Sequence, residues 1–206
     1  MSEKKVTSLV WFRNNLRVID NLSLKKSIEN SDKVIGYVNI DPNINSTTIY
    51  GFKKTEKFRI KFLLESISDL KKQLKKINVS LVVKNEDLKS SINSVIKKDE
   101  IDNIYIQKEW TRDELIEEEC IPSDINLIKD FDQFLFSPSD VSEIYENIPR
   151  GFSNFRKKCE KYLSIDDIIP TPKPLNKNNL IKEEYSIPSI SDLGYEEFEV
   201  HNDSTF

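Results

Sequence analysis

Glycine, cysteine and histidine are all scarce in this chain of 206 residues, and each shortage excludes a class of site. The four glycines form neither a G-x-G-x-x-G pattern nor a phosphate-binding loop, so the dinucleotide fingerprint is missing. One histidine, His201, is too few for a Ser-His-Asp triad or a histidine-based zinc site in a tail this polar. Cys120 and Cys159 lie far apart, which excludes a cysteine-rich metal site and favours a reducing compartment. We therefore expect no catalytic residue and no metal ligand.

Long apolar runs and an excess of positive charge are also missing. No apolar run approaches the roughly 20 residues that a membrane span requires, and the first five residues are polar. We therefore expect no membrane partner and a cytoplasmic protein. The formal net charge of −4 argues against nonspecific nucleic-acid binding, which depends on clustered Lys and Arg. The 37% of hydrophobic residues is enough for one well-packed domain with an appendage.

Strand and helix patterns alternate through the first two-thirds of the chain. Short apolar runs predict strands at 7–13, 33–40, 79–83, 103–106 and 125–128. Apolar residues at a spacing of three and four predict helices at 22–29, 56–77, 86–97 and 112–120. Asp20 or Asn21 is expected to cap the first helix, and Thr111 with Glu114 to form a capping box on the last. The alternation predicts an α/β fold, namely a Rossmann-like open parallel five-stranded sheet with helices on both faces.

The character of the sequence changes after Phe136. We take 1–136 as the α/β domain and 137–163 as a helical extension of the same domain, with a helix within 149–163. Residues 164–206 are polar, contain four prolines and show no periodicity, so they read as an extended interdomain linker or tail. Such a segment is extended or disordered when free, and in a larger protein it can wrap over the surface.

Residues 11–21 read WFRNNLRVIDN, which resembles the signature W-F-R-x-D-L-R-x-x-D-N of the photolyase/cryptochrome family. The family's usual Asp is replaced by Asn15. Further matches follow in the family's order and are most similar to the DASH-type cryptochromes: KT at 54–55 with FLLESISDL at 62–70, QKEWTRDEL at 107–115, PSD at 138–140 with PRGFSNFRKKCE at 149–160, and PSISDLG at 188–194. Together these matches span nearly the whole chain.

The resemblance implies a role as part of a larger protein. Family members continue into a large helical domain that binds FAD, holds the electron-transfer tryptophans and grips damaged DNA. Here the two tryptophans, Trp11 and Trp110, both lie in the α/β domain. We therefore expect an antenna-type domain that supports blue-light-driven, FAD-dependent repair of pyrimidine dimers in a full-length DASH-like protein, without catalysis or FAD of its own. Its partner would be the helical domain in cis or in trans, and DNA would bind only through that domain.

A different class of function stays open beside this one. The chain is alternatively a free-standing Rossmann-like module that binds a small ligand or another protein. Such a module would keep the fold without the flavin chemistry.

The resemblance also implies a chromophore site. The family's α/β domain accommodates an antenna chromophore, usually a folate such as methenyltetrahydrofolate. Glu109, just beyond the fourth strand, is the first candidate to bind it, and Lys108 and Gln107 are weaker ones. Open parallel sheets bind ligands outside the carboxyl ends of their strands, and a carboxylate accepts hydrogen bonds from a pterin's amino and ring N–H groups. The alternative is that Glu109 is an exposed residue that interacts with the N-terminal dipole of the next helix.

Two other groups of residues have a structural interpretation as well as a functional one. The polar loop after the first strand either lines a pocket or stabilises itself, with Arg17 paired to Asp20 and the asparagines bonding turn backbone, and we favour the second. The glutamates at 117–119 point in different directions on a helix, so we expect all three to be solvated.

Aromatic residues gather in the predicted helix within 149–163. Phe152, Phe155 and Tyr162 are either core residues or the surface that would meet the helical domain. Without that domain such a surface is exposed, which favours self-association of the chain.

Overall fold

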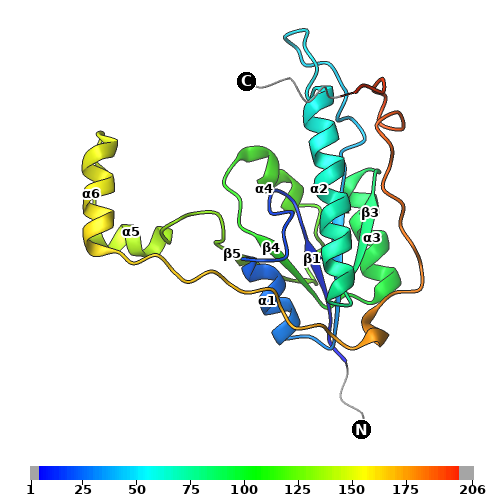
Figure 1. Ribbon diagram of the computed structural model, residues 1–206, viewed down its shortest axis with the longest axis horizontal. Coiled ribbons are helices and arrows are strands. Elements are labelled where there is room, and N and C mark those ends of the chain that lie inside the picture. The colour runs from blue at the N-terminus through cyan, green and yellow to red at the C-terminus, as the bar shows by residue number, and fades with distance from the viewer. Residues whose placement is uncertain (1–4, 200–206) are drawn as a thin grey trace.

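The computed structural model of the chain describes residues 5–199 and is built around a five-stranded sheet (Figure 1). His201 lies outside the described residues. The strands are β1 (Thr7–Trp11), β2 (Lys33–Asn39), β3 (Ser80–Lys84), β4 (Asn103–Gln107) and β5 (Asn126–Asp130). All neighbouring pairs are parallel, in the order β3-β2-β1-β4-β5. The strand order reverses between β1 and β4, which is the position at which open parallel sheets generally bind ligands.

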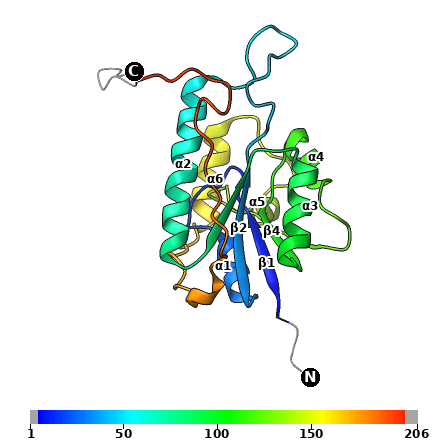
Figure 2. The ribbon, with the colours of Figure 1, turned by 90° about the vertical axis from the view of Figure 1, so that its right-hand side faces the viewer.

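Helices cover both faces of the sheet, which confirms the predicted α/β architecture (Figure 2). α1 (Leu22–Glu29) and α2 (Lys57–Lys76) pack on one face, whereas α3 (Leu88–Asp99) and α4 (Arg112–Glu118) lie on the other. Successive strand residues serve opposite faces: Val10 packs with α1 and α2, and Trp11 packs with α3. Because both faces are buried, the strands are continuous apolar runs rather than alternating ones.

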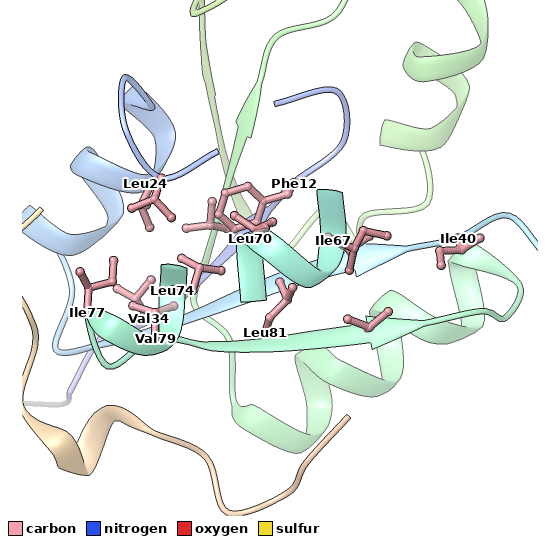
Figure 3. Packing of buried hydrophobic residues seen from close by; sticks show 14 of the residues in the cluster. Phe12, Leu24, Val34, Ile40, Ile67, Leu70, Leu74, Ile77, Val79 and Leu81 are labelled. Atoms are coloured by element: carbon pink, nitrogen blue, oxygen red, sulfur yellow. The ribbon is translucent and has the colours of Figure 1, made fainter. Parts of the chain in front are cut away.

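Gly36 of β2 allows α2 to pack closely on the sheet. A Cβ atom at this position would lie 3.0 Å from Leu81 Cδ1, 3.1 Å from Leu74 Cδ1 and 3.2 Å from Phe12 Cε2. All three side chains belong to the core under α2, where Leu70 is also fully buried (Figure 3). The space that a side chain would fill at Gly36 is thus already occupied by its neighbours.

The two predicted helix caps had opposite outcomes. Asn21 caps α1, since its Oδ1 accepts a hydrogen bond from Leu24 N at 2.9 Å, as predicted. The prediction of a capping box at α4 is wrong, because the Thr111 side chain makes no capping hydrogen bond. Glu114 turns inward instead: its Oε2 is buried, and its carbonyl oxygen accepts a hydrogen bond from Arg13 Nη1 at 3.1 Å.

The chain then leaves the sheet for two helices that lie to one side of it (Figure 1). These are α5 (Pro138–Ile144) and α6 (Phe152–Tyr162). α6 confirms the helix predicted within 149–163, whereas α5 was not predicted. α5 begins with Ser137 as N-cap and Pro138 in the first turn, a combination that favours a helix start.

Residues 164–199, called the strap below, pack back onto the α/β domain. The strap is extended as predicted, apart from one 3-10 turn, η1 (Lys177–Asn179). It runs beside edge strand β3 (orange to red in Figure 1), with Tyr185 packed on the α3 face and Leu193 on the α2 face. Near its end, Tyr195 is 5% exposed and its hydroxyl donates to Thr55 O at 2.7 Å. The core of the α/β fold therefore includes residues from the strap.

Within residues 5–199, no helix is both long enough and apolar enough to span a membrane.

Candidate functional site

The candidate residues Gln107 and Glu109 lie at the carboxyl end of β4, beside the loop that follows β1. Gln107 is the last residue of the strand, and its side chain is 3% exposed. Glu109 is 5% exposed, so the interpretation of Glu109 as an exposed residue before a helix is wrong. The residue turns toward the β1 loop rather than toward the first turn of α4, whose own acidic residues are Asp113 and Glu114.

Two side-chain amides hold the Glu109 carboxylate. Its Oε1 accepts hydrogen bonds from Gln107 Nε2 at 2.9 Å and from Asn14 Nδ2 at 3.2 Å. Within the described part of the chain no cation pairs with Glu109, and no donor reaches its Oε2. Gln107 Oε1 is also buried and has no hydrogen-bond partner among these residues. Glu109 Oε2 and the buried Gln107 Oε1 therefore both keep an unused capacity to accept hydrogen bonds.

Lys108 points away from this pair of acceptors and toward aromatic rings. Its Nζ lies 5.2 Å from the ring centroid of Trp110 and 4.6 Å from that of Phe131. The two rings stack on each other with centroids 5.2 Å apart, and both are at least 40% exposed. An aromatic surface with a cation on it therefore lies next to Glu109 in the sequence and at the same edge of the sheet.

Arg13 joins the β1 loop to β4 and α4 beneath the candidate site. Its Nη2 donates to Gln107 O at 2.8 Å and to Glu118 Oε1 at 3.0 Å. The side chains of Arg13 and Glu118 are 6% and 5% exposed, and Lys129 also pairs with Glu118. The prediction that Glu118 is solvated is therefore wrong, because α4 turns this residue toward Arg13 in the loop after β1 and Lys129 in β5. Arg13 thus positions the strand ends through Nη1 and Nη2, while its buried Nε has no hydrogen-bond partner among the described residues.

The rest of the β1 loop stabilises itself, largely as predicted. Asn15 Oδ1 accepts from Arg13 N at 3.3 Å, and Arg17 Nε donates to the carbonyl oxygen of Asp20 at 2.8 Å. The charge partner of Arg17 is Asp132, with Nη2 and Oδ2 3.5 Å apart, and not Asp20. Asn14 is the exception in this loop, since it bonds Glu109. Sequence reasoning placed Asn14 in the loop but did not connect it with Glu109.

Burial raises the pKa of Asp132 above its ordinary value. Desolvation is the largest cause, and it outweighs the hydrogen bond from Leu22 N at 3.0 Å and the charge of Arg17. Burial likewise raises the pKa of Glu117, although Arg13 opposes this effect. Glu117 on α4 and Asp132 after β5 thus both hold their carboxyl groups in a partly dehydrated environment.

A cavity lies beside Trp110, and Glu109 is not among the residues that line it. It has a volume of about 690 Å³ and lies between the segment after β5 and helices α5 and α6. Over residues 5–199, no cluster of His, Cys, Asp and Glu has the geometry of a metal site. The chemistry of the candidate site therefore rests on hydrogen bonding and aromatic contact.

The sequence of the chain matches a known protein family over most of its length. A family model described as DNA photolyase matches residues 8–175. The chain belongs to the DNA photolyase family.

The relatives in this family include DASH-type cryptochromes. Cryptochrome DASH of Gloeobacter violaceus is 31% identical over 201 residues, which cover 95% of this chain and 40% of the relative. Cryptochrome DASH of Synechocystis sp. is 29% identical over 188 residues, covering 88% of this chain and 38% of the relative. The resemblance drawn from the sequence motifs is thus confirmed. The chain spans about two fifths of the length of these relatives.

Solved structures agree with the fold. The Synechocystis cryptochrome structure superposes with a TM-score of 0.82 at 28% identity, covering 97% of this chain and 42% of that one. A photolyase from Sulfolobus tokodaii, described as containing two FAD molecules with the implication of a novel light-harvesting cofactor, gives a TM-score of 0.70 at 19% identity. The second likeness supports the fold alone.

Proposed function

We propose that this chain is the antenna-type domain of a DASH-like cryptochrome or photolyase and that it holds a folate-type chromophore at Glu109. In a full-length protein, the domain would support blue-light-driven repair of pyrimidine dimers. When bound, the folate absorbs light and transfers the excitation energy to FAD elsewhere in that protein. The observation that carries the proposal is the buried Glu109 carboxylate, held by two amides and without a cation among the described residues.

The hydrogen-bonding capacity of the site favours a pterin over a flavin. A pterin presents an amino group and a ring N–H side by side, and both donate. A flavin instead presents one ring N–H between two carbonyl oxygens, which would face the carboxylate oxygens of Glu109. Because the Glu109 carboxylate only accepts hydrogen bonds, two adjacent donors suit it better than one donor between two acceptors.

Lys108 and Trp110 suit the remaining parts of a folate. The exposed ring of Trp110, stacked on Phe131, offers an apolar face to the aminobenzoyl ring. The Lys108 ammonium beside these rings would attract the glutamate carboxylates. In this proposal Glu109 and Gln107 orient the pterin, and Lys108 contributes charge.

The proposal assigns no catalysis and no FAD to this chain alone. Its partner is the helical, FAD-binding part of the longer relatives, in cis or in trans, and DNA would bind through that part only. This arrangement is supported by the length of the relatives, because the match to this chain covers only about 40% of each. The division into a domain at 1–136, an extension at 137–163 and a linker at 164–206 belongs to the same proposal.

A free-standing small-ligand module is the second candidate function. The same unpaired acceptors of Glu109 and Gln107 favour it, because they suit any ligand with two adjacent N–H donors. Binding of a bare pterin ring (2-amino-4-oxopteridine) as tightly as a complete folate would support this alternative.

Titration of the purified protein with methenyltetrahydrofolate, followed by near-ultraviolet absorbance, tests the proposal. We expect saturable binding, and no binding of FAD. The variant Glu109→Gln should weaken binding by about 10-fold to 100-fold, since hydrogen bonds to a charged group contribute about 1.5–3 kcal/mol. Glu119→Gln, at an exposed position, is the matched control and should bind like the wild type. Equal affinity of the Glu109 and Glu119 variants would refute the site.

A further inference from the structure

The large cavity beside Trp110 is an open groove along α6, called the α6 groove below. Its walls are mainly apolar and include the rings of Trp110, Phe134, Phe152 and Phe155. Of the residues in the proposed chromophore site, Trp110 also lines this groove.

The walls of the α6 groove lack a covering layer. Phe152 is 72% exposed, Ile148 68% and Leu135 65%, although all three line the groove. α5 buries none of its residues, and α6 buries only Cys159. Exposed apolar side chains gathered along one groove are a feature of interaction sites. A small ligand would leave most of these exposed walls in water, so a macromolecular surface fits better.

The charges in the groove are self-complementary. Among the described residues that line it, the charged ones are Arg156 and Glu160, one helical turn apart on α6. They pair with each other at 3.5 Å between Nε and Oε1, with side chains 56% and 58% exposed. If a second α6 lies antiparallel to the first, Arg156 meets the partner's Glu160 and Glu160 meets the partner's Arg156. A two-fold interface requires this kind of self-complementary surface.

We propose that, in the 206-residue chain, the α6 groove is covered by the α6 groove of a second copy. The two α6 helices run antiparallel, the aromatic rings pack in the centre, and two reciprocal Arg–Glu pairs flank them. The apolar walls then leave water together, which supplies the driving force, and the charge pairs fix the direction of the helices. This inference does not depend on the proposed chromophore site.

Sedimentation velocity of four proteins over a range of concentrations tests the dimer. The wild type should form a concentration-dependent dimer. Arg156→Glu and Glu160→Arg each place like charges opposite each other twice, so each should raise the dissociation constant about tenfold or more. The double variant Arg156→Glu/Glu160→Arg should recover the dimer, because every facing pair is again opposite in sign.

A mixture of the two single variants separates the interface from effects within one helix. Each single variant keeps a like-charged pair inside its own α6, so repair of the helix itself cannot restore association. Across the antiparallel interface, however, both facing pairs become opposite in charge, and the mixture should form a heterodimer more tightly than either variant forms a homodimer. A mixture that stays as monomeric as its components would overturn the antiparallel arrangement.

Two aromatic variants complete the test. Phe152→Ser should weaken the dimer, whereas Phe62→Ser removes an equally exposed ring on α2, outside the groove, and should not. Far-ultraviolet circular dichroism checks that both variants fold. A wild type that is monomeric at every concentration would overturn the proposal. So would a monomer whose groove instead binds the remaining part of a longer relative.

Discussion

Asn179 in the strap hydrogen-bonds both backbone groups of Val34 in β2. Its Oδ1 accepts from Val34 N at 2.9 Å, and its Nδ2 donates to Val34 O at 3.0 Å. β3 begins opposite Ile35, so the Asn179 amide lies where the ladder between β2 and β3 ends. The same Nδ2 also donates to Asn78 O at 2.7 Å, and Asn179 is only 4% exposed. One buried amide thus fastens the strap to the sheet.

Replacement of Asn179 by Ala should destabilise the protein by about 2–3 kcal/mol, because it leaves buried backbone groups of Val34 without partners. Urea unfolding at equilibrium measures this change. Asn178→Ala is the matched control, since Asn178 is exposed, and its effect should stay within about 0.5 kcal/mol. Equal stability of the two variants would mean that the strap is not held by this amide.

Gly36→Ala should lower the stability by about 1–3 kcal/mol, the usual cost of adding volume to a filled core. The added methyl carbon would lie 3.0 Å from Leu81 Cδ1. Gly151→Ala serves as comparison, because the nearest heavy atom to a Cβ there is 3.9 Å away. Thermal unfolding should show a clear decrease in the midpoint for the Gly36 variant and little change for the other. A tolerant Gly36 would show that α2 does not pack this closely on β2.

Glu118→Ala should destabilise the fold by about 3 kcal/mol, because it leaves the buried Arg13 guanidinium without its nearest carboxylate. Glu117, 3.9 Å from Arg13 Nη1, reduces this loss but lies too far for a direct hydrogen bond. Glu119→Ala removes an exposed neighbour and should change little. Chemical denaturation of both variants distinguishes a buried ion pair from a solvated row of glutamates.

Asp132 should make the stability depend on pH. Because burial raises its pKa, the folded protein holds this proton more tightly than the unfolded chain does. The contribution is fully present below the unfolded pKa and is lost as the pH rises through the folded pKa. The wild type should therefore gain stability relative to Asp132→Asn on acidification from neutral pH through the carboxyl range. Unfolding free energies of both proteins across that range measure the difference, and a constant difference would contradict the shift.

Much of the fold could be predicted because its signals are local. The strands are continuous apolar runs, and α2 keeps a strict apolar face over five turns, with Ile60, Ile67 and Leu74 all fully buried. α5 was not predicted, because Val141 and Ile144 are its only apolar residues after Pro138 and give a weak helical spacing. Its Ser137-Pro138 start is a local signal that would have indicated it.

The candidate site was only partly predictable because its contacts are distant in the sequence. Glu109 was indicated by its place after β4 and by the family resemblance, but its burial depends on Asn14, 95 residues earlier. Arg13 and Glu118 lie 105 residues apart, and no helical spacing reveals that they pair. For the same reason, the interpretation that paired Arg17 with nearby Asp20 overlooked Asp132. The order of the strands in the sheet decides which side chains, distant in the sequence, are buried together.

The position of the strap beside β3 has a consequence for how the molecule behaves among other molecules. An open strand edge presents unpaired N–H and C=O groups, onto which a strand from another chain can add. The strap blocks that approach with side chains fixed on both faces of the sheet, Tyr185 on one and Leu193 on the other. A chain shortened before Asn179 would lose this shield, and its solutions should scatter light through edge-to-edge aggregation. The segment that looks most like a mere connector is thus a barrier to polymerisation.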